Sequence, residues 1–249
     1  MTAANKPPRT LLKHATTGPA ARLRKTRMSP ADRERQIIDG AIAYFSEVGF
    51  SGQTRELSKR LGITQPLLYR YFSNKQALID RVYQTVIEGR WNQGWIALLE
   101  DRTIPFRDRL IEFYRQYSEG TFRTDWIRIY MYAGLSIPAL NQRYIKLVRQ
   151  ELMPVYCREL RHFCGLHQLD TNVSDDEMEF VYSLHGGIFY YAIRQHIYKV
   201  RTSSGFMTRV AFAVDNFLAG ATTVYPQLLA GASNNTKQPA PKSRGAGSR

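Results

Sequence analysis

The sequence lacks the marks of a membrane protein and of a disulfide-bonded protein. No apolar run approaches the roughly 18 residues that a membrane span needs. Only two of the 249 residues are cysteines, Cys157 and Cys164. In one predicted helix they stand about 10 Å apart along the axis, which is too far for a mutual disulfide. We therefore expect a globular cytoplasmic protein of a reducing compartment, without a membrane partner.

Acidic residues are missing from both ends of the chain. The net charge is +14, and residues 1–28 contribute +7 and residues 231–249 contribute +4, with no acid in either segment. Both segments are rich in small residues and proline and poor in large apolar groups, so we expect a disordered basic arm and a disordered basic tail. The arm either lies along DNA or only keeps the protein soluble. Its composition also fits an organelle transit peptide, against which Pro7, Pro8 and Pro19 interrupt any helix.

Catalytic signatures are missing as well. The sequence has no serine nucleophile elbow, no phosphate-binding glycine loop and no paired carboxylates at a readable spacing. The best metal candidate is the set Cys157, His162, Cys164 and His167, but these positions point to different faces of one predicted helix. We expect no enzyme, no metal site and no cofactor.

Helix start and stop signals are abundant from residue 29 onward. Ser29 is placed as an N-cap with Pro30 at the first helical position, and an apolar stripe from Ile37 to Val48 ends at Gly49. These features predict a first helix.

Three further helix starts follow within a few turns. We expect Thr54 to cap a short second helix that ends at Gly62, and Thr64 to cap a third. Ser73 and Gln76 are spaced as the capping box of a fourth. Two short helices joined by a glycine-containing turn form a helix-turn-helix.

The rest of the chain predicts more helix and no strand, because no stretch alternates with period two. Ser174 and Glu177 form another capping-box pattern. The expected helices are 106–122, 126–135, 138–165, 175–200 and 206–229. The predicted fold class is all-α.

The third helix carries the candidate DNA contacts. The N-terminal residues of the second helix of a helix-turn-helix meet base edges in the major groove. Base reading is therefore expected from Gln65, Pro66, Leu67 and Arg70. Tyr69, Tyr71 and Lys75 are expected on phosphates. The alternative is that the apolar members are core and the charged ones are merely solvated.

The segment "RERQIIDGAIAYFSEVGF…TRELSKRLGITQPLLYRYFSNKQALIDRVY", residues 33–83, resembles the DNA-binding domain of the TetR family of bacterial transcriptional regulators. It matches in a helix ending in Phe-x-x-x-Gly-Phe, then Leu-x-x-x-Leu-Gly-Ile-Thr, then Leu-Tyr-x-x-Phe with a lysine three residues on. The resemblance implies that Arg55 is a further base reader and that Gln53, Thr54 and Thr64 contact phosphate. Gln53 departs from the family, which commonly has a threonine there.

The resemblance also implies a domain division. It gives a three-helix DNA-binding domain, residues 29–80, followed by a helical bundle for effector binding and dimerisation, residues 81–230.

A dimer is expected because one helix-turn-helix reads too few base pairs, and paired domains bind half-sites about 34 Å apart. The resemblance implies that the last two long helices form the interface as a four-helix bundle. An intramolecular core is the alternative for the same stripe. The expected interface residues are Leu184, Gly187, Ile188, Tyr191, Val210, Val214, Phe217 and Leu218.

A small-molecule effector is also implied by the resemblance. Ligand pockets are mostly apolar and aromatic with a few polar groups, and the middle helices are rich in aromatic residues. Aromatic residues at helical spacing also form plain core, so both interpretations stay open. The expected pocket residues are Trp91, Trp95, Phe113, Tyr117, Trp126, Tyr130, Tyr144, His185 and Phe189.

These features together predict a sequence-specific DNA-binding transcriptional regulator, a repressor. It is expected to act as a homodimer on a palindromic operator of double-stranded DNA, and to be released by a small, largely apolar or aromatic ligand. The alternative is a constitutive or architectural DNA-binding protein without an effector.

Overall fold

The computed structural model describes residues 28–166, 172–200 and 204–235. Within these residues the chain is all-helical, as predicted, with eleven α-helices, one 3₁₀ turn and one π turn. None of the described helices combines the length and hydrophobicity of a membrane span. The predicted arm, apart from Met28, and the tail beyond Asn235 lie outside the described residues.

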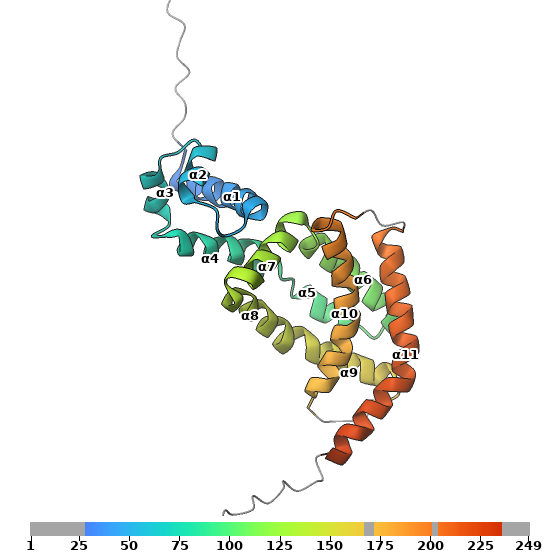
Figure 1. The fold of residues 1–249 in the computed structure, drawn as a ribbon. Helices are drawn as coiled ribbons and strands as arrows, with labels where there is room; N and C mark the ends of the chain where they lie inside the picture. Colours follow the sequence, from blue (N-terminus) through green and yellow to red (C-terminus); the bar gives the residue numbers. More distant parts are fainter. Residues whose placement is uncertain (1–27, 167–171, 201–203, 236–249) are drawn as a thin grey trace, which may run out of the picture.

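The first three helices and the start of α4 form a small domain at one end of the molecule (Figure 1). Ser29 caps α1 by accepting a 3.1 Å hydrogen bond from the backbone N–H of Asp32, with Pro30 in the first turn. Gly49 ends α1 with φ at 77°, a conformation that favours glycine. The bounds are α1 Pro30–Val48, α2 Thr54–Arg60, α3 Gln65–Tyr71 and α4 Lys75–Val86.

Two of the predicted helix caps are wrong. The N-cap of α2 is Gln53, without a side-chain hydrogen bond, because the Thr54 hydroxyl is engaged by α3 instead. The N-cap of α4 is Asn74, whose Oδ1 accepts a 2.9 Å hydrogen bond from the N–H of Ala77, and not Ser73. Thr64 caps α3 as predicted, accepting from the N–H of Leu67 at 3.3 Å.

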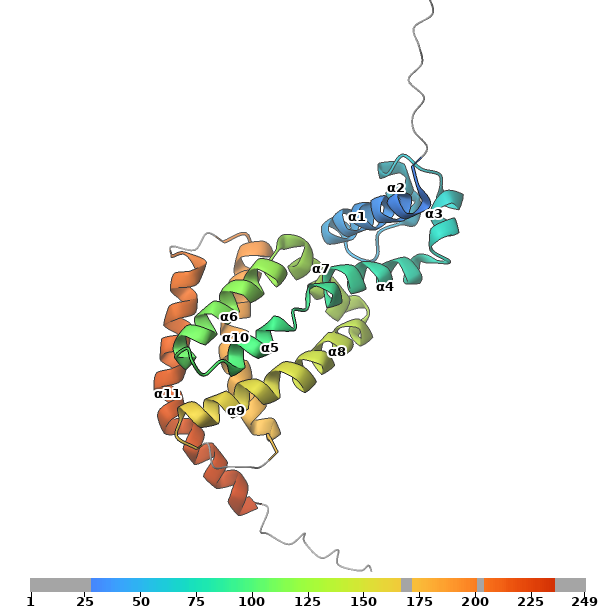
Figure 2. The ribbon, with the colours of Figure 1, turned by 180° about the vertical axis from the view of Figure 1, so that it is seen from behind.

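The remaining helices form the body, to which α4 leads (Figures 1 and 2). A short helix, α5, lies in a region where no individual helix was predicted. The 138–165 segment, predicted as one helix, is interrupted by a π turn just before Pro154, which has no N–H to donate to the preceding turn. The last helix runs to Asn235 and so takes in the first five residues of the expected disordered tail. The bounds are η1 Glu88–Arg90, α5 Gly94–Glu100, α6 Phe106–Thr121, α7 Thr124–Ser136, α8 Pro138–Leu147, η2 Val148–Leu152, α9 Met153–Phe163, α10 Asp175–His196 and α11 Phe206–Asn235.

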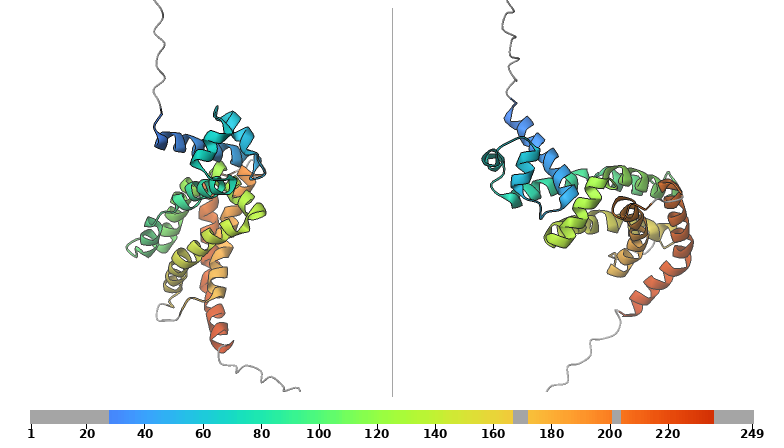
Figure 3. Two further views of the ribbon diagram at one scale, coloured as in Figure 1. Left: turned by 90° about the vertical axis from the view of Figure 1, so that its left-hand side faces the viewer. Right: turned by 45° about the horizontal axis from the view of Figure 1, so that its top comes forward.

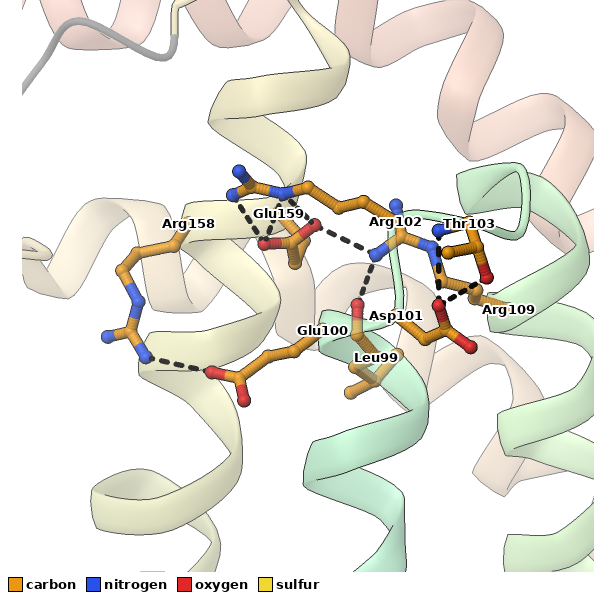
Figure 4. A network of polar contacts seen from close by, with 8 residues as sticks. All are labelled: Leu99, Glu100, Asp101, Arg102, Thr103, Arg109, Arg158 and Glu159. Carbon is orange, nitrogen blue, oxygen red and sulfur yellow. Dashed lines mark hydrogen bonds and ion pairs between the residues drawn. The ribbon is translucent and has the colours of Figure 1, made fainter.

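The body is held by two buried carboxylates. The Glu159 carboxylate of α9 accepts hydrogen bonds from Arg109 of α6 and from Arg102 of the α5–α6 loop, both at 2.8 Å. Arg109 also donates to the carbonyl oxygen of Leu99 (Figure 4). Because both the carboxylate and the Arg109 guanidinium are almost fully buried, each depends on the other for a partner. This network fixes α5, α6 and α9 relative to one another.

Glu177 is the second buried carboxylate. It closes the predicted capping box with Ser174 at the start of α10, which confirms that prediction. Its oxygens also accept from Arg161 of α9 at 2.7 Å and from the Tyr225 hydroxyl of α11 at 2.8 Å. One side chain therefore joins three helices.

Helices α10 and α11 lie side by side along one flank of the body (Figure 3). Helix α7 lies at the other side, against α1 of the small domain as well as against α8 and α10. Helix α7 thus connects the body to the helix-turn-helix.

Candidate functional site

Helix α3 is anchored by apolar residues and presents its remaining face to solvent. Leu68 and Phe72 are buried in the core shared with α1 and α4. Pro66, Tyr69 and Arg70 are exposed, while the other predicted contacts on α3, namely Gln65, Leu67 and Tyr71, are half-buried. The predicted base and phosphate contacts on α3 therefore lie on the solvent side of an anchored helix.

Thr54 ties α2 to α3. Its hydroxyl accepts a 3.0 Å hydrogen bond from Gln65 Nε2 and lies 2.9 Å from the Tyr69 hydroxyl. Only 7% of Thr54 is exposed, so its hydroxyl orients Gln65 and Tyr69 and does not itself face solvent. This connection could not be read from sequence spacing, because it joins positions in two different helices.

Arg55, Arg70 and Lys75 have no acid partner within the part of the chain that the structure describes. Ion pairs among the described residues engage Arg60 with Glu47 at 2.6 Å, but none engages Arg55, Arg70 or Lys75. Glu56, the chain neighbour of Arg55, contacts Arg60 and forms no ion pair with Arg55. Lys75 opens α4 directly after its Asn74 cap, where the backbone N–H groups favour anions. These side chains are free to meet phosphate or base edges.

A pocket of about 400 Å³ opens in the body between α6, α7, α8, η2 and α10. Six of the nine predicted pocket residues line it: Tyr117, Trp126, Tyr130, Tyr144, His185 and Phe189. The other three, Trp91, Trp95 and Phe113, stand one layer behind and pack on the lining rings. Trp91 lies 6.5 Å from Tyr144, and Trp95 and Phe113 lie 5.0 and 5.5 Å from Tyr117 between ring centroids.

Sequence reasoning missed six lining residues: Ile145, Val148, Arg149, Glu179, Tyr182 and Gly186. Helical spacing gave a signal for three of them. Tyr182 precedes His185 by three positions, Gly186 precedes Phe189 by three, and Val148 follows Tyr144 by four, so each shares a helix face with a predicted residue. No such signal distinguished the charged pair Arg149 and Glu179 from an ordinary solvated surface.

Burial governs the ionisation of the pocket lining. It lowers the pKa of His185 to about 4, so this imidazole is neutral near pH 7. Burial raises the pKa of Tyr130, and it raises the pKa of Tyr144 well above its ordinary value. These three lining side chains are therefore uncharged over the physiological pH range.

The predicted dimer residues lie mostly inside one chain. Leu184, Ile188 and Tyr191 of α10 and Val210, Val214 and Leu218 of α11 are all buried, because these stripes pack α10 against α11. These six side chains thus belong to the intramolecular core, which was the alternative interpretation, and they are buried within the single chain. An amphipathic stripe does not reveal whether its partner helix belongs to the same chain. Gly187 is exposed and Phe217 is half-buried against Phe180.

A different face of these helices is exposed. Phe212 is 62% exposed, and Tyr190 and Val224 are about half exposed. Gly187 and Gly220 have open space where a Cβ would stand. A groove of about 240 Å³ between the helices is lined by residues that include Gly187 and Phe212.

Both cysteines, which also belong to the candidate metal set, lie in the body. Cys157 and Cys164 are free thiols. Among the described residues no group of three or more histidine, cysteine or carboxylate side chains is placed to hold a metal ion. His167 of the candidate set lies outside the described residues.

The fold and the exposed α3 define a helix-turn-helix protein whose second, helical domain contains an aromatic pocket. Residues 37–82 match the family model described as bacterial regulatory proteins, tetR family. This segment is therefore similar to the DNA-binding domain of TetR-family bacterial regulators.

Three comparisons illustrate this similarity. The chain is 31% identical over 94 residues to the tetracycline repressor protein class D of Escherichia coli, a match that covers 34% of this chain and 43% of that repressor. It thus spans less than half the length of that curated relative. A tetR-family regulator from Streptomyces coelicolor superposes with a TM-score of 0.58 at 18% identity, covering 85% of this chain and 92% of that one. A TetR-like regulator from Rhodococcus sp. RHA1 gives 0.56 at 20% identity, with 78% and 100% covered. The two structures support the fold.

Proposed function

We propose that this chain is a transcriptional repressor that binds a palindromic operator as a homodimer and is released by a small, apolar or aromatic ligand. One observation supports the DNA-binding part: an anchored α3 presents exposed polar and basic side chains, and among the described residues Arg55, Arg70 and Lys75 have no acid partner. The relative from Escherichia coli is named a repressor, which supports the sign of regulation. The working division is a DNA-binding domain, residues 29–80, and a body, residues 81–230.

Base reading is assigned to the start of α3 and to Arg55. Arginine suits a guanine edge, glutamine suits an adenine edge, and Pro66 and Leu67 suit a thymine methyl group. Thr54 holds Gln65 by a hydrogen bond, so the amide is oriented before DNA arrives. Arg70 is the residue on which discrimination depends most, because its guanidinium is exposed and forms no ion pair with any residue that the structure describes.

Phosphate binding is assigned to residues that flank this surface. Lys75 sits on the N-terminal turn of α4, and Tyr71 lies at the end of α3. Gln53 and Thr64 occupy the N-cap positions of α2 and α3. Thr54 acts in this assignment as a positioning residue for Gln65 and Tyr69.

Dimerisation is assigned to the exposed face of α10 and α11. Phe212 and Val224 supply apolar area there, and the glycines permit close approach of a partner helix. The groove that contains Gly187 and Phe212 gives this face a concave shape. A second copy using the same face would form a closed, two-fold pair.

Release is assigned to the aromatic pocket. Trp126 and Tyr130 of its wall belong to α7, the helix that also packs on α1 of the DNA-binding domain. A ligand that prefers one position of α7 shifts the equilibrium between two spacings of the paired DNA-binding domains. The size of that shift is set by the difference in the ligand's affinity for the two conformations.

The DNA-binding part is tested with fragmented genomic DNA. The wild-type chain is expected to retain a small set of fragments, and Arg70→Ala is expected to lose that selectivity while its melting temperature stays the same. Arg115→Ala removes an equal charge from the exposed surface of the body and serves as the matched control. Equal selectivity in the wild type and in Arg70→Ala would overturn the base-reading assignment.

A further inference from the structure

We propose that the pocket selects an uncharged, planar aromatic molecule whose hydrogen-bond acceptor, such as a ketone oxygen, pairs with the indole N–H of Trp126. The inference rests on the proposed effector role of this pocket and specifies the chemistry of its occupant. It follows from an unpaired donor, from the arrangement of the rings and from the charge of the wall.

Trp126 supplies the donor. Only 1% of this residue is exposed, it lines the pocket, and its Nε1 has no hydrogen-bond partner among the described residues. By contrast, the indole N–H of Trp91 donates to Gln93 Oε1 at 3.1 Å. A buried N–H without a partner is costly, so a ligand that brings an acceptor to it gains affinity over one that does not.

The rings of the wall favour a flat aromatic ligand. Trp126 and Tyr130 are stacked, with centroids 4.9 Å apart and planes 14° apart. Tyr144 and Phe189 stand at 73° and 79° to the Trp126 plane. Stacked and edge-to-face surfaces meet in one pocket, and both geometries are the ones that aromatic rings prefer. The volume of about 400 Å³ suits a molecule of a few fused rings.

The charged groups of the lining do not favour an ion of either sign. Arg149 of η2 is already paired with Asp175, and Glu179 of α10 is exposed, so solvent screens its charge. His185 is held neutral by burial, which lowers its pKa to about 4, and burial raises the pKa of Tyr130 and Tyr144. The same desolvation that suppresses imidazolium and phenolate penalises a charged ligand.

The test uses four three-ring probes titrated calorimetrically into the full-length chain. They are 9-fluorenone, which is neutral with a ketone; fluorene, which is neutral without an acceptor; 10-methylacridinium, a cation; and anthracene-9-carboxylate, an anion. We expect fluorenone to bind roughly ten-fold more tightly than each of the other three, as one satisfied buried donor allows.

Two variants locate the donor. Trp126→Phe keeps a ring and removes the N–H, so it should make fluorenone and fluorene bind equally. Trp95→Phe is the matched control, because Trp95 is equally buried with an unpaired Nε1 but does not line the pocket. It should keep the ten-fold ratio. If Trp126→Phe unfolds, Gly186→Leu replaces it: a Cβ there meets no atom within 4 Å, and the longer side chain should fill the pocket and weaken fluorenone binding at least ten-fold.

The inference is overturned if fluorene or a charged probe binds as tightly as fluorenone, if no probe binds, or if Trp126→Phe keeps the ratio. Failure of the proposed function looks different. If fluorenone binds with the expected pattern but does not alter retention of genomic fragments, the ligand chemistry stands and the effector role fails. If fragments are retained selectively but the probes fail, only the ligand chemistry is overturned.

Discussion

Arg128 of α7 donates a 3.0 Å hydrogen bond from Nη2 to the carbonyl oxygen of Glu47 at the end of α1. Its Nε donates to the neighbouring carbonyl of Ser46, and Tyr132 one turn later reaches the same Glu47 oxygen at 3.4 Å. The last carbonyls of a helix lack intrahelical partners and carry the negative end of the helix dipole. A cation from the body therefore caps the first helix of the DNA-binding domain.

Replacing Arg128 tests this interdomain contact. Arg128→Gln shortens the side chain and removes its charge, so two carbonyl oxygens lose a charged donor. We expect the free energy of unfolding in urea to fall by about 2 kcal/mol. Arg115→Gln, which loses only exposed ion pairs within α6, should change it by less than about 0.5 kcal/mol. If both variants lower the free energy of unfolding by the same amount, the contact between Arg128 and the end of α1 does not stabilise the protein beyond an exposed ion pair.

Asn141 of α8 links the pocket wall to α4. Its Oδ1 accepts from the Tyr83 hydroxyl at 3.0 Å, and its Nδ2 donates to the carbonyl oxygen of Tyr130 at 3.0 Å. Asn141→Ala and Tyr83→Phe each remove one end of the first bond, so their effects on unfolding free energy should be non-additive by about 1 kcal/mol. The double-mutant cycle measures this coupling, and simple additivity would mean that the bond is not formed in solution.

Glu177 makes stability depend on pH. Burial alone would raise its pKa, but hydrogen bonds from Arg161, Ser174 and Tyr225 outweigh burial and lower the pKa overall. A lowered folded-state pKa gives stability that is present above the unfolded value, about 4.3, and is lost as the pH falls through the folded value. We expect Glu177→Gln to cost about 3 kcal/mol at pH 7 and much less at pH 3.

Urea denaturation at several pH values measures this dependence. Glu119→Gln, which removes an exposed carboxylate paired with Arg115, is the control and should show little loss at any pH. The carboxylate is not the source of the effect if the Glu177→Gln deficit is the same at pH 3 as at pH 7.

Phe212 is the most exposed large apolar side chain on α11. In the proposed dimer it is covered by the partner, so Phe212→Asp should place a charge in the interface and yield monomer in sedimentation velocity. Leu135→Asp is the matched control, because Leu135 is 81% exposed at the end of α7 and is not part of the proposed α10–α11 face. A clean Phe212→Asp dimer would move the interface elsewhere.

Local chemistry explains what the sequence could predict. Ser29, Thr64 and the Ser174–Glu177 pair define helix starts through bonds to residues three positions away, and such spacing is visible in the chain. The aromatic wall was predictable for a related reason, since large aromatic residues at helical spacing must be buried somewhere.

Longer-range geometry explains what the sequence could not predict. The stripe of Val214 and Leu218 fits a second chain as well as α10 of its own, and only the folded packing decides between them. The Thr54 hydroxyl was assigned to a cap because its bond to Gln65 crosses between helices. The Arg128 cap joins residues 81 positions apart and has no local signature.

The central claim is that two copies of this chain read a two-fold symmetric site in double-stranded DNA. The most direct measurement is selection from a random duplex library followed by determination of the mass of the complex with the enriched duplex. The account predicts a palindromic motif with half-sites about one helical turn apart, bound by two chains and preferred at least about a thousand-fold over scrambled duplex. No enriched motif, or a single chain on the enriched duplex, would contradict it.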